Sequence, residues 1–311
     1  MPDGVGLVRA AACGFGVAFA LGTVGAAVSR REPALAGVAV LVACVWGGIA
    51  GLLALPAIPS LPPASGLDRF LLILLPVALA IEAEAAAGWL DGFWLSVERA
   101  LVAMVAMPVL LHGSVWLTGG SQRVWVGMFA AAFVLWGAWE GTAGHVRATG
   151  DRLVAAVTAV ALLAAGLAIM LAGWLKGGVV AIPLAAAFGG ATLVAGGTGF
   201  ARLGTKAGLA GLSSAGIVAL FGLVVIGRCF GRLGTASAAL LLAAPLLVAI
   251  ADGLARSLPD TVGARLVRST RYRLLLAAVP LVIVLVAAKA EFDSTLGRLL
   301  VTPAPSAAAE P

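Results

Sequence analysis

Ten apolar segments follow one another along this chain of 311 residues. They cover residues 8–28, 34–56, 70–89, 95–117, 124–145, 153–174, 178–198, 208–228, 235–254 and 273–290. A helix needs roughly 20 apolar residues to cross the hydrocarbon core of a bilayer, and each segment is about that long. The pattern therefore predicts an all-α, polytopic bundle of about ten transmembrane helices joined by short loops.

Charge is scarce and scattered. Hydrophobic residues make up 62% of the chain and charged residues 11%, whereas soluble domains carry about 25% charged residues, so a soluble fold is excluded. The net charge of +6 comes from basic residues that stand singly or in short groups between apolar segments, as in the loops of membrane proteins. We therefore expect the bilayer of the plasma membrane as the partner, and no nucleic acid.

We expect one transmembrane domain over residues 1–301, followed by a disordered Pro/Ala-rich tail at 302–311. A division near residue 150 would give two halves of five helices, 1–150 and 151–301, which suits an inverted-repeat transporter. The halves show no internal sequence similarity, so this division rests on analogy with such folds alone.

Two local features bear on helix packing. The seventh and eighth segments are crowded with glycine, so we expect one of them to be broken or re-entrant. Trp46 lies in the middle of the second segment, and we expect it to pack inside the bundle.

The orientation follows from the loop arginines and lysines, because cytoplasmic loops carry the excess of these residues. The loops after odd-numbered segments hold twelve of them and the opposite side holds eight. This bias places the odd-numbered loops in the cytoplasm and both termini outside.

The third segment, from Arg69 to Trp89, carries two carboxylates, Glu82 and Glu84. A charged side chain inside a membrane helix costs about 2.5–3.5 kcal/mol on insertion scales, so something must offset the cost. Glu140 and Asp252 lie near the ends of two further segments that run in the same direction. These four carboxylates should therefore share one leaflet, the one with more basic residues.

Two interpretations of these acids remain open. Some of them could line an aqueous cavity and bind protons or a cationic substrate, as intramembrane acids of transporters do. Alternatively, they could reach head-group water or pair with Arg99, Arg147 or Arg256. Glu82 and Glu84 point about 200° apart on a helix, so both cannot face one narrow cavity.

The two histidines fall toward opposite leaflets, which excludes joint ligation of a haem or a metal ion. We count His112 among the candidate intramembrane polar residues, although a hydrogen-bonded packing role is the simpler interpretation; His145 follows the fifth segment on the acidic side. Phosphate-binding loops, metalloprotease motifs and nucleophile elbows are absent from the sequence. We therefore expect no metal, no cofactor and no enzymatic activity.

The loop between the last two segments is the most basic part of the chain. Arg265, Arg268 and Arg271 could hold it on anionic lipid head groups, at about 1 kcal/mol per basic residue near the surface. The simpler role of these arginines is to fix the topology.

The leading functional hypothesis is a secondary transporter for a small solute that uses intramembrane carboxylates. The alternative is a non-catalytic subunit or scaffold that packs against partner membrane proteins or further copies of itself. A transporter needs a polar cavity that reaches Glu82, Glu84 or Glu140. A scaffold should have a filled core and a conspicuous outer face of small residues.

Overall fold

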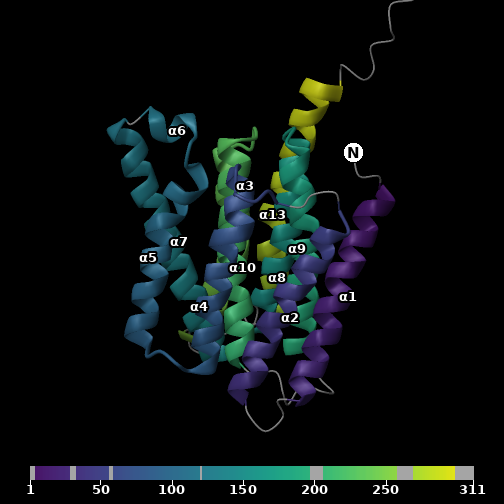
Figure 1. The fold of residues 1–311 in the computed structure, drawn as a ribbon, viewed down its shortest axis with the longest axis vertical. Helices are drawn as coiled ribbons and strands as arrows, with labels where there is room; N and C mark the ends of the chain where they lie inside the picture. The colour runs from purple at the N-terminus through teal and green to yellow at the C-terminus, as the bar shows by residue number, and fades with distance from the viewer. Residues whose placement is uncertain are drawn as a thin grey trace, which may run out of the picture.

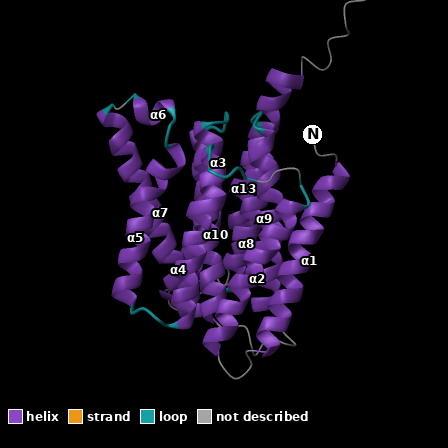
Figure 2. Ribbon diagram, viewed as in Figure 1, coloured by secondary structure: helices purple, strands orange, loops and turns teal. Residues whose placement is uncertain are grey.

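A computed structural model describes residues 4–28, 33–55, 59–119, 121–196, 206–257 and 269–297. Within these ranges the chain is all-α without a strand, and ten helices are long and apolar enough to cross a membrane (Figures 1 and 2). Nine of them are α1 Gly4–Val28, α2 Pro33–Leu53, α5 Gly92–Leu111, α7 Gln122–Thr149, α8 Arg152–Leu171, α9 Leu175–Gly196, α10 Lys206–Cys229, α11 Thr235–Ser257 and α13 Thr270–Phe292. The predicted polytopic helical bundle is confirmed, and the chain is a multi-pass membrane protein.

The remaining span is continuous but irregular. It consists of α3 (Gly66–Arg69), a π-helical turn (Phe70–Leu74) and α4 (Leu75–Ala87). Pro76 stands just after the π turn, and a proline inside a helix has no N–H to donate and crowds the preceding turn. The π turn widens the backbone at this point, as π bulges do elsewhere. A short helix, α6 (Val115–Thr118), and a second π turn (Asp293–Gly297) complete the described elements.

Helix α10 is the centre of the bundle (Figure 1). Every residue from Gly208 to Gly227 is buried, and α10 packs against α2, α4, α5, α7, α8, α9 and α11. Helices that are apolar on all sides belong in such an interior position.

The expectation that one glycine-rich segment is broken or re-entrant is wrong, because α9 and α10 are both uninterrupted helices. Their glycines serve close packing instead. A Cβ at Gly216 would lie 2.5 Å from Thr158 Cγ2, and one at Gly222 would collide with the ring of Phe70. Small residues of this kind let membrane helices approach one another closely.

A second set of close contacts joins α1, α2 and α9. A Cβ at Gly47 would lie 2.6 Å from the carbonyl oxygen of Gly14, and one at Gly51 would lie 2.5 Å from Pro183 Cβ. Trp46, beside Gly47, is 54% exposed, so the expectation that it packs inside the bundle is wrong. In a membrane its apolar ring gains as much from lipid contact as from a protein core.

Successive helices run in opposite directions, so the bundle has two ends. At the lower end in Figure 1, α4 is followed by α5 and α7 by α8. The first residues of α1 and the last residues of α13 lie at the upper end. Asp91 caps α5 at the lower end by accepting a hydrogen bond from the backbone N–H of Trp94 at 3.1 Å.

Candidate functional site

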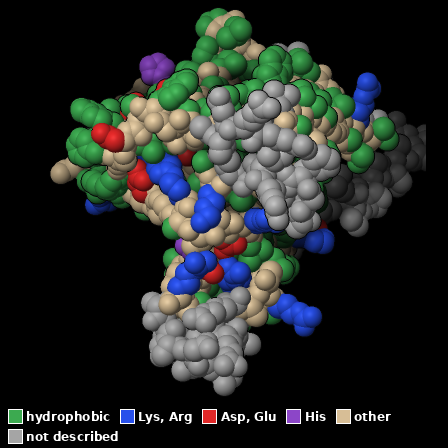
Figure 3. All heavy atoms as spheres, turned by 90° about the horizontal axis from the view of Figure 1, so that it is seen from below, with side chains coloured by type: hydrophobic (Ala, Val, Ile, Leu, Met, Phe, Trp, Pro, Cys, Tyr) green, Lys and Arg blue, Asp and Glu red, His purple; other side chains and the backbone are tan. Residues whose placement is uncertain are grey.

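Charged side chains gather at the lower end of the bundle, and Figure 3 views the molecule from this side. Two clusters can be defined among the described residues. The buried triad, Glu82, Arg99 and Glu140, joins α4, α5 and α7. The rim cluster joins α7, α8, α11 and α13 where these helices end or begin; it consists of His145, Asp151, Asp252, Arg256 and Arg273.

Arg99 is the centre of the buried triad. Its Nε donates to Glu82 Oε1 at 2.9 Å, and its Nη2 lies 2.7 Å from the same oxygen. Its Nη1 donates to Glu140 Oε2 at 2.8 Å. The side chains of Arg99 and Glu82 are 1% and 0% exposed, whereas that of Glu140 is 29% exposed. One guanidinium thus bridges a fully buried carboxylate and a partly accessible one.

Trp139 completes the surroundings of Glu82. Its indole Nε1 donates to Glu82 Oε1 at 2.6 Å, and the guanidinium carbon of Arg99 lies 5.9 Å from the centroid of its ring. Ser214 of α10 faces the same carboxylate, but its hydroxyl donates to the carbonyl oxygen of Ala210 at 2.7 Å. The second oxygen, Glu82 Oε2, is buried and accepts no hydrogen bond from the described residues. The hydrogen bonds that Glu82 accepts from the described residues therefore converge on one oxygen, Oε1.

The charges in the triad do not balance. With both carboxylates ionised, the single positive charge of Arg99 leaves a net charge of −1 inside the bundle. Glu140 Oε1 is also buried without a hydrogen bond from the described residues. Buried charges are normally paired and hydrogen-bonded, because removing them from water is costly. The triad therefore has capacity for one more proton or cation.

The triad lies well inside the bundle, away from the lower ends of its three helices. At about 1.5 Å per residue, Glu82 is about 8 Å from the lower end of α4, and Arg99 is about 10 Å from the lower end of α5. Glu140 is about 13 Å from the end of α7 by the same measure. Three helices thus bring charged groups to similar depths within the membrane.

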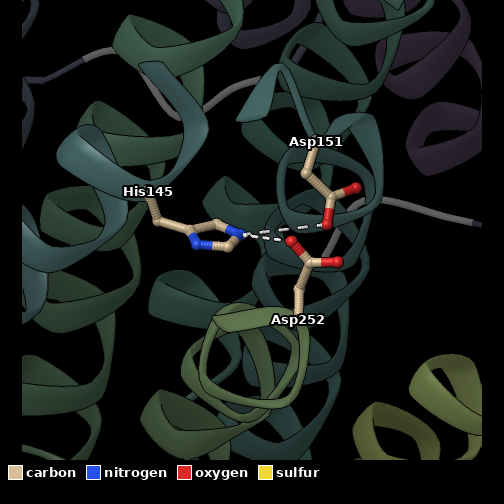
Figure 4. A group of neighbouring side chains, drawn as sticks. All are labelled: His145, Asp151 and Asp252. Atoms are coloured by element: carbon tan, nitrogen blue, oxygen red, sulfur yellow. Dashed lines mark ion pairs between the residues drawn. The ribbon is translucent and has the colours of Figure 1, made fainter. Parts of the chain in front are cut away.

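The rim cluster ties four helices together. Arg273 Nη1 lies 2.7 Å from Asp151 Oδ2 and 3.0 Å from Asp252 Oδ1, and Arg256 Nε lies 2.8 Å from Asp252 Oδ2. His145 points between the two aspartates (Figure 4). Its Nε2 is 3.4 Å from Asp252 Oδ2 and 4.0 Å from Asp151 Oδ2.

The rim cluster has the donor types of a metal site but is already occupied by a cation of the chain. His145, Asp151 and Asp252 each offer a ligand atom within 4.8 Å of the others. However, the oxygen of Asp151 that faces His145 also binds Arg273 Nη1. A divalent ion would have to displace this guanidinium, so the arrangement favours a structural ion-pair network.

The structure separates the candidate residues named from the sequence. Glu82 and Glu140 meet at Arg99, and Asp252 joins His145 in the rim cluster. Glu84 is half-buried on another face of α4 and has no ion pair or side-chain hydrogen bond to the described residues.

His112 and the basic loop lie apart from both clusters. His112 is exposed at the upper end of α5, where its carbonyl oxygen accepts a hydrogen bond from Arg69 Nη1 at 2.6 Å, so it does not have the expected packing role. Arg271 is exposed in the first turn of α13, and Arg265 and Arg268 fall outside the described residues.

Sequence reasoning missed two important groups, Trp139 and Arg273, and misplaced a third. Arg99 was a possible partner of the acids but was counted among the loop charges, whereas α5 begins at Gly92 and carries Arg99 seven residues into the helix. The Asp91 cap was a usable signal for that earlier start. Trp139 and Arg273 had no distinguishing pattern, because tryptophans and arginines are both common at the ends of membrane helices.

Comparison with known proteins does not assign the chain to a family. No family model, curated protein or solved structure significantly matches this chain. Its function must therefore be argued from the charged groups inside the bundle.

Proposed function

We propose that the chain is a proton-coupled permease for a small solute, and that the buried triad is its proton-binding centre. The observation that carries the proposal is the bridging of two carboxylates by one guanidinium within membrane-spanning helices. Ionisable residues inside a membrane protein are costly and commonly mark ion or proton pathways. The lower end of the bundle would face the cytoplasmic side of the plasma membrane, in line with the charge bias of the sequence.

A proton is the ligand that would neutralise the net negative charge of the triad. One proton on either carboxylate would make the triad neutral, and its removal would leave a net negative charge. The two carboxylates share Arg99, so a proton on one of them changes the ion pair that the other makes. A site with these two charge states can couple proton binding to a rearrangement of α4, α5 and α7.

Glu140 is the group through which protons would enter. It is 29% exposed, whereas Glu82 and Arg99 are almost completely buried. Protonation of Glu140 would weaken its bond to Arg99 and leave the guanidinium to Glu82 alone. This change would loosen the link from α7 to α5 while the link from α4 to α5 is kept.

A second candidate, a non-catalytic packing subunit, is favoured by a different observation. Cβ atoms at Gly137, Gly141 and Gly144 would meet nothing within 4 Å, so α7 presents an open glycine face. Such faces allow close approach of another membrane helix. The filled surroundings of α10 also suit this role. The two candidates differ in whether the triad carries protons or only holds helices together.

The test is proton movement in liposomes that contain a trapped pH-sensitive dye. A panel of small amines, organic acids, amino acids and sugars is added outside under an imposed pH gradient. We expect at least one solute to produce a protein-dependent pH change that is lost in Glu82→Gln and Glu140→Gln. Glu84→Gln is the matched control and should behave as wild type, because Glu84 lies on the same helix outside the triad. Identical proton traces for wild type and all three variants would overturn the permease proposal.

A further inference from the structure

An apolar groove lies between the membrane-spanning helices α2 and α4, and residues of α9 form its base. Its volume is about 510 Å³, within the roughly 300–1,000 Å³ range of pockets that hold single small molecules. Among the described residues that line it, no side chain carries a charge, an amide or a hydroxyl group. Representative lining residues are Leu41, Gly48, Leu52, Leu72, Leu79 and Phe188.

The groove persists because small or backbone-distorting residues face it. Gly48 of α2 and Ala80 and Ala83 of α4 leave space where larger side chains would close the gap. Pro76 also lines it, two residues after the end of the π turn. Phe70, in that turn, is held against Gly222 of α10, so the upper part of this span is pinned to the central helix.

The groove is long and runs along the helices. Its lining extends from Leu41 to Leu53 on α2, and from Leu71 in the π turn to Ala83 on α4. Each stretch rises about 18 Å at 1.5 Å per residue. The hydrocarbon core of one leaflet is about 15 Å thick, half of the total of about 30 Å. The groove therefore reaches from the upper boundary of the membrane past its middle.

We propose that this groove is a binding site for one acyl chain of a bilayer lipid from the upper leaflet. The head group would stay near Leu53 and Pro59, and the chain end would lie beside Ala83. At this depth the surrounding medium is hydrocarbon, and a lipid chain is the one occupant whose apolar chemistry and length both match the lining. A chain fixed against helix surfaces gains dispersion contacts that offset its loss of conformational freedom.

A helix from a second copy fits the groove less well. A helix with its side chains is about 10–12 Å wide. The small residues in its lining make room for a narrow chain, and the large ones, such as Leu72 and Leu79, would obstruct a helix.

The lipid site is argued independently of the proton-binding centre, although both use the same stretch of α4. Ala83, at the inner end of the groove, directly follows Glu82 in the chain. Leu41 lies beside α10 near Glu82, since a Cβ at Gly211 would be 3.0 Å from Leu41 Cδ1 and 3.5 Å from Glu82 Cβ. One layer of side chains therefore separates the lipid chain end from the triad.

The experiment combines native mass spectrometry with photolabelling. The full chain is purified in mild detergent and its retained lipid is weighed. It is then reconstituted with a phosphatidylcholine that carries a diazirine near the end of one acyl chain. We expect one retained lipid per protein, and photolabel concentrated on peptides that contain the groove residues of α2 and α4.

Variants and a control decide the assignment. Gly48→Leu combined with Ala80→Phe should fill the groove and abolish both lipid retention and the concentrated label. Ala278→Phe on α13 is the matched control, because Ala278 is a small, exposed residue outside the groove; this variant should keep both signals. If the double variant does not fold, the wild-type label map decides. Either of two results would overturn the proposal. One is photolabel spread equally over α2, α4 and the exposed face of α13; the other is a measured mass that corresponds to a protein dimer without lipid.

Discussion

Arg99 binds Glu82 through two nitrogens, Nε and Nη2, that both lie close to one carboxylate oxygen, Oε1. The opposite oxygen is left without a hydrogen bond from the described residues, although the whole side chain is buried. A purely structural pair would be expected to use both oxygens, since a fork-to-fork arrangement adds energy and geometric specificity. The free oxygen is a position at which Glu82 could accept a proton without releasing Arg99.

Removal of Arg99 should destabilise the protein strongly. Arg99→Met leaves two carboxylates buried without a positive charge, and breaking a buried ion pair from one side costs about 3–5 kcal/mol. Thermal unfolding in detergent should show a large drop in Tm. Adding Glu82→Gln to this variant should restore part of the loss, because one of the stranded charges is then gone. A double variant that loses as much as the two single changes combined would argue against this coupling.

The hydrogen bond from Trp139 to Glu82 should contribute measurably to stability. Trp139→Phe keeps an aromatic ring but removes the Nε1 donor, which we expect to cost about 1–3 kcal/mol. Trp136 is the matched control on the same helix, because its Nε1 is buried without a hydrogen-bond partner among the described residues. Trp136→Phe should therefore cost less. Equal losses of Tm in the two variants would mean that ring packing, rather than the hydrogen bond, stabilises this region.

The rim cluster should respond to divalent cations only after Arg273 is removed. Arg273 Nη1 binds oxygens of both Asp151 and Asp252, so a Zn²⁺ ion has to compete with it. We expect Zn²⁺ to leave the Tm of the wild type unchanged and to raise that of Arg273→Ala, in which Asp151 Oδ2 and Asp252 Oδ1 lose this guanidinium while Arg256 still binds Asp252 Oδ2. Arg273→Ala combined with His145→Ala is the control and should lose the response. A rise in the wild type would show that the native cluster takes up a metal.

The orientation can be tested at two exposed positions at opposite ends of α7. In a background in which Cys13, Cys44 and Cys229 are replaced by alanine, single cysteines are introduced as Ser121→Cys and Ala148→Cys. If the lower end is cytoplasmic, an impermeant thiol reagent outside intact cells should label position 121 and not position 148. The reverse pattern would invert the topology.

The helices could be predicted well from the sequence because the bilayer allows few other backbone structures. An apolar segment of about 20 residues must satisfy its backbone hydrogen bonds internally, so its length and composition specify a helix. The same reasoning failed for Trp46, which faces outward. Lipid and protein interior are equally apolar, so hydrophobicity does not indicate which face of a membrane helix is buried.

The candidate site was predicted only in part. Glu82 and Glu140 stood out because charge is rare in these segments, and pairing with Arg99 was among the alternatives considered. Which carboxylate meets which arginine depends on how α4, α5 and α7 pack, and a single sequence does not specify that packing. The loop-charge count shares this weakness. Among the described residues, Arg99, Arg256 and Arg273 on one side and Lys289 on the other form ion pairs, and without them the bias is nine against seven.

Infrared spectroscopy of the carboxyl groups tests the central claim most directly. Difference spectra of the reconstituted protein between acidic and alkaline buffer report the C=O band of protonated carboxylic acids. We predict a band in the wild type that is lost or displaced in Glu82→Gln and in Glu140→Gln and is retained in Glu84→Gln. A wild-type spectrum without such a band, or one that Glu82→Gln and Glu140→Gln leave unchanged, would contradict a proton-binding role for the triad.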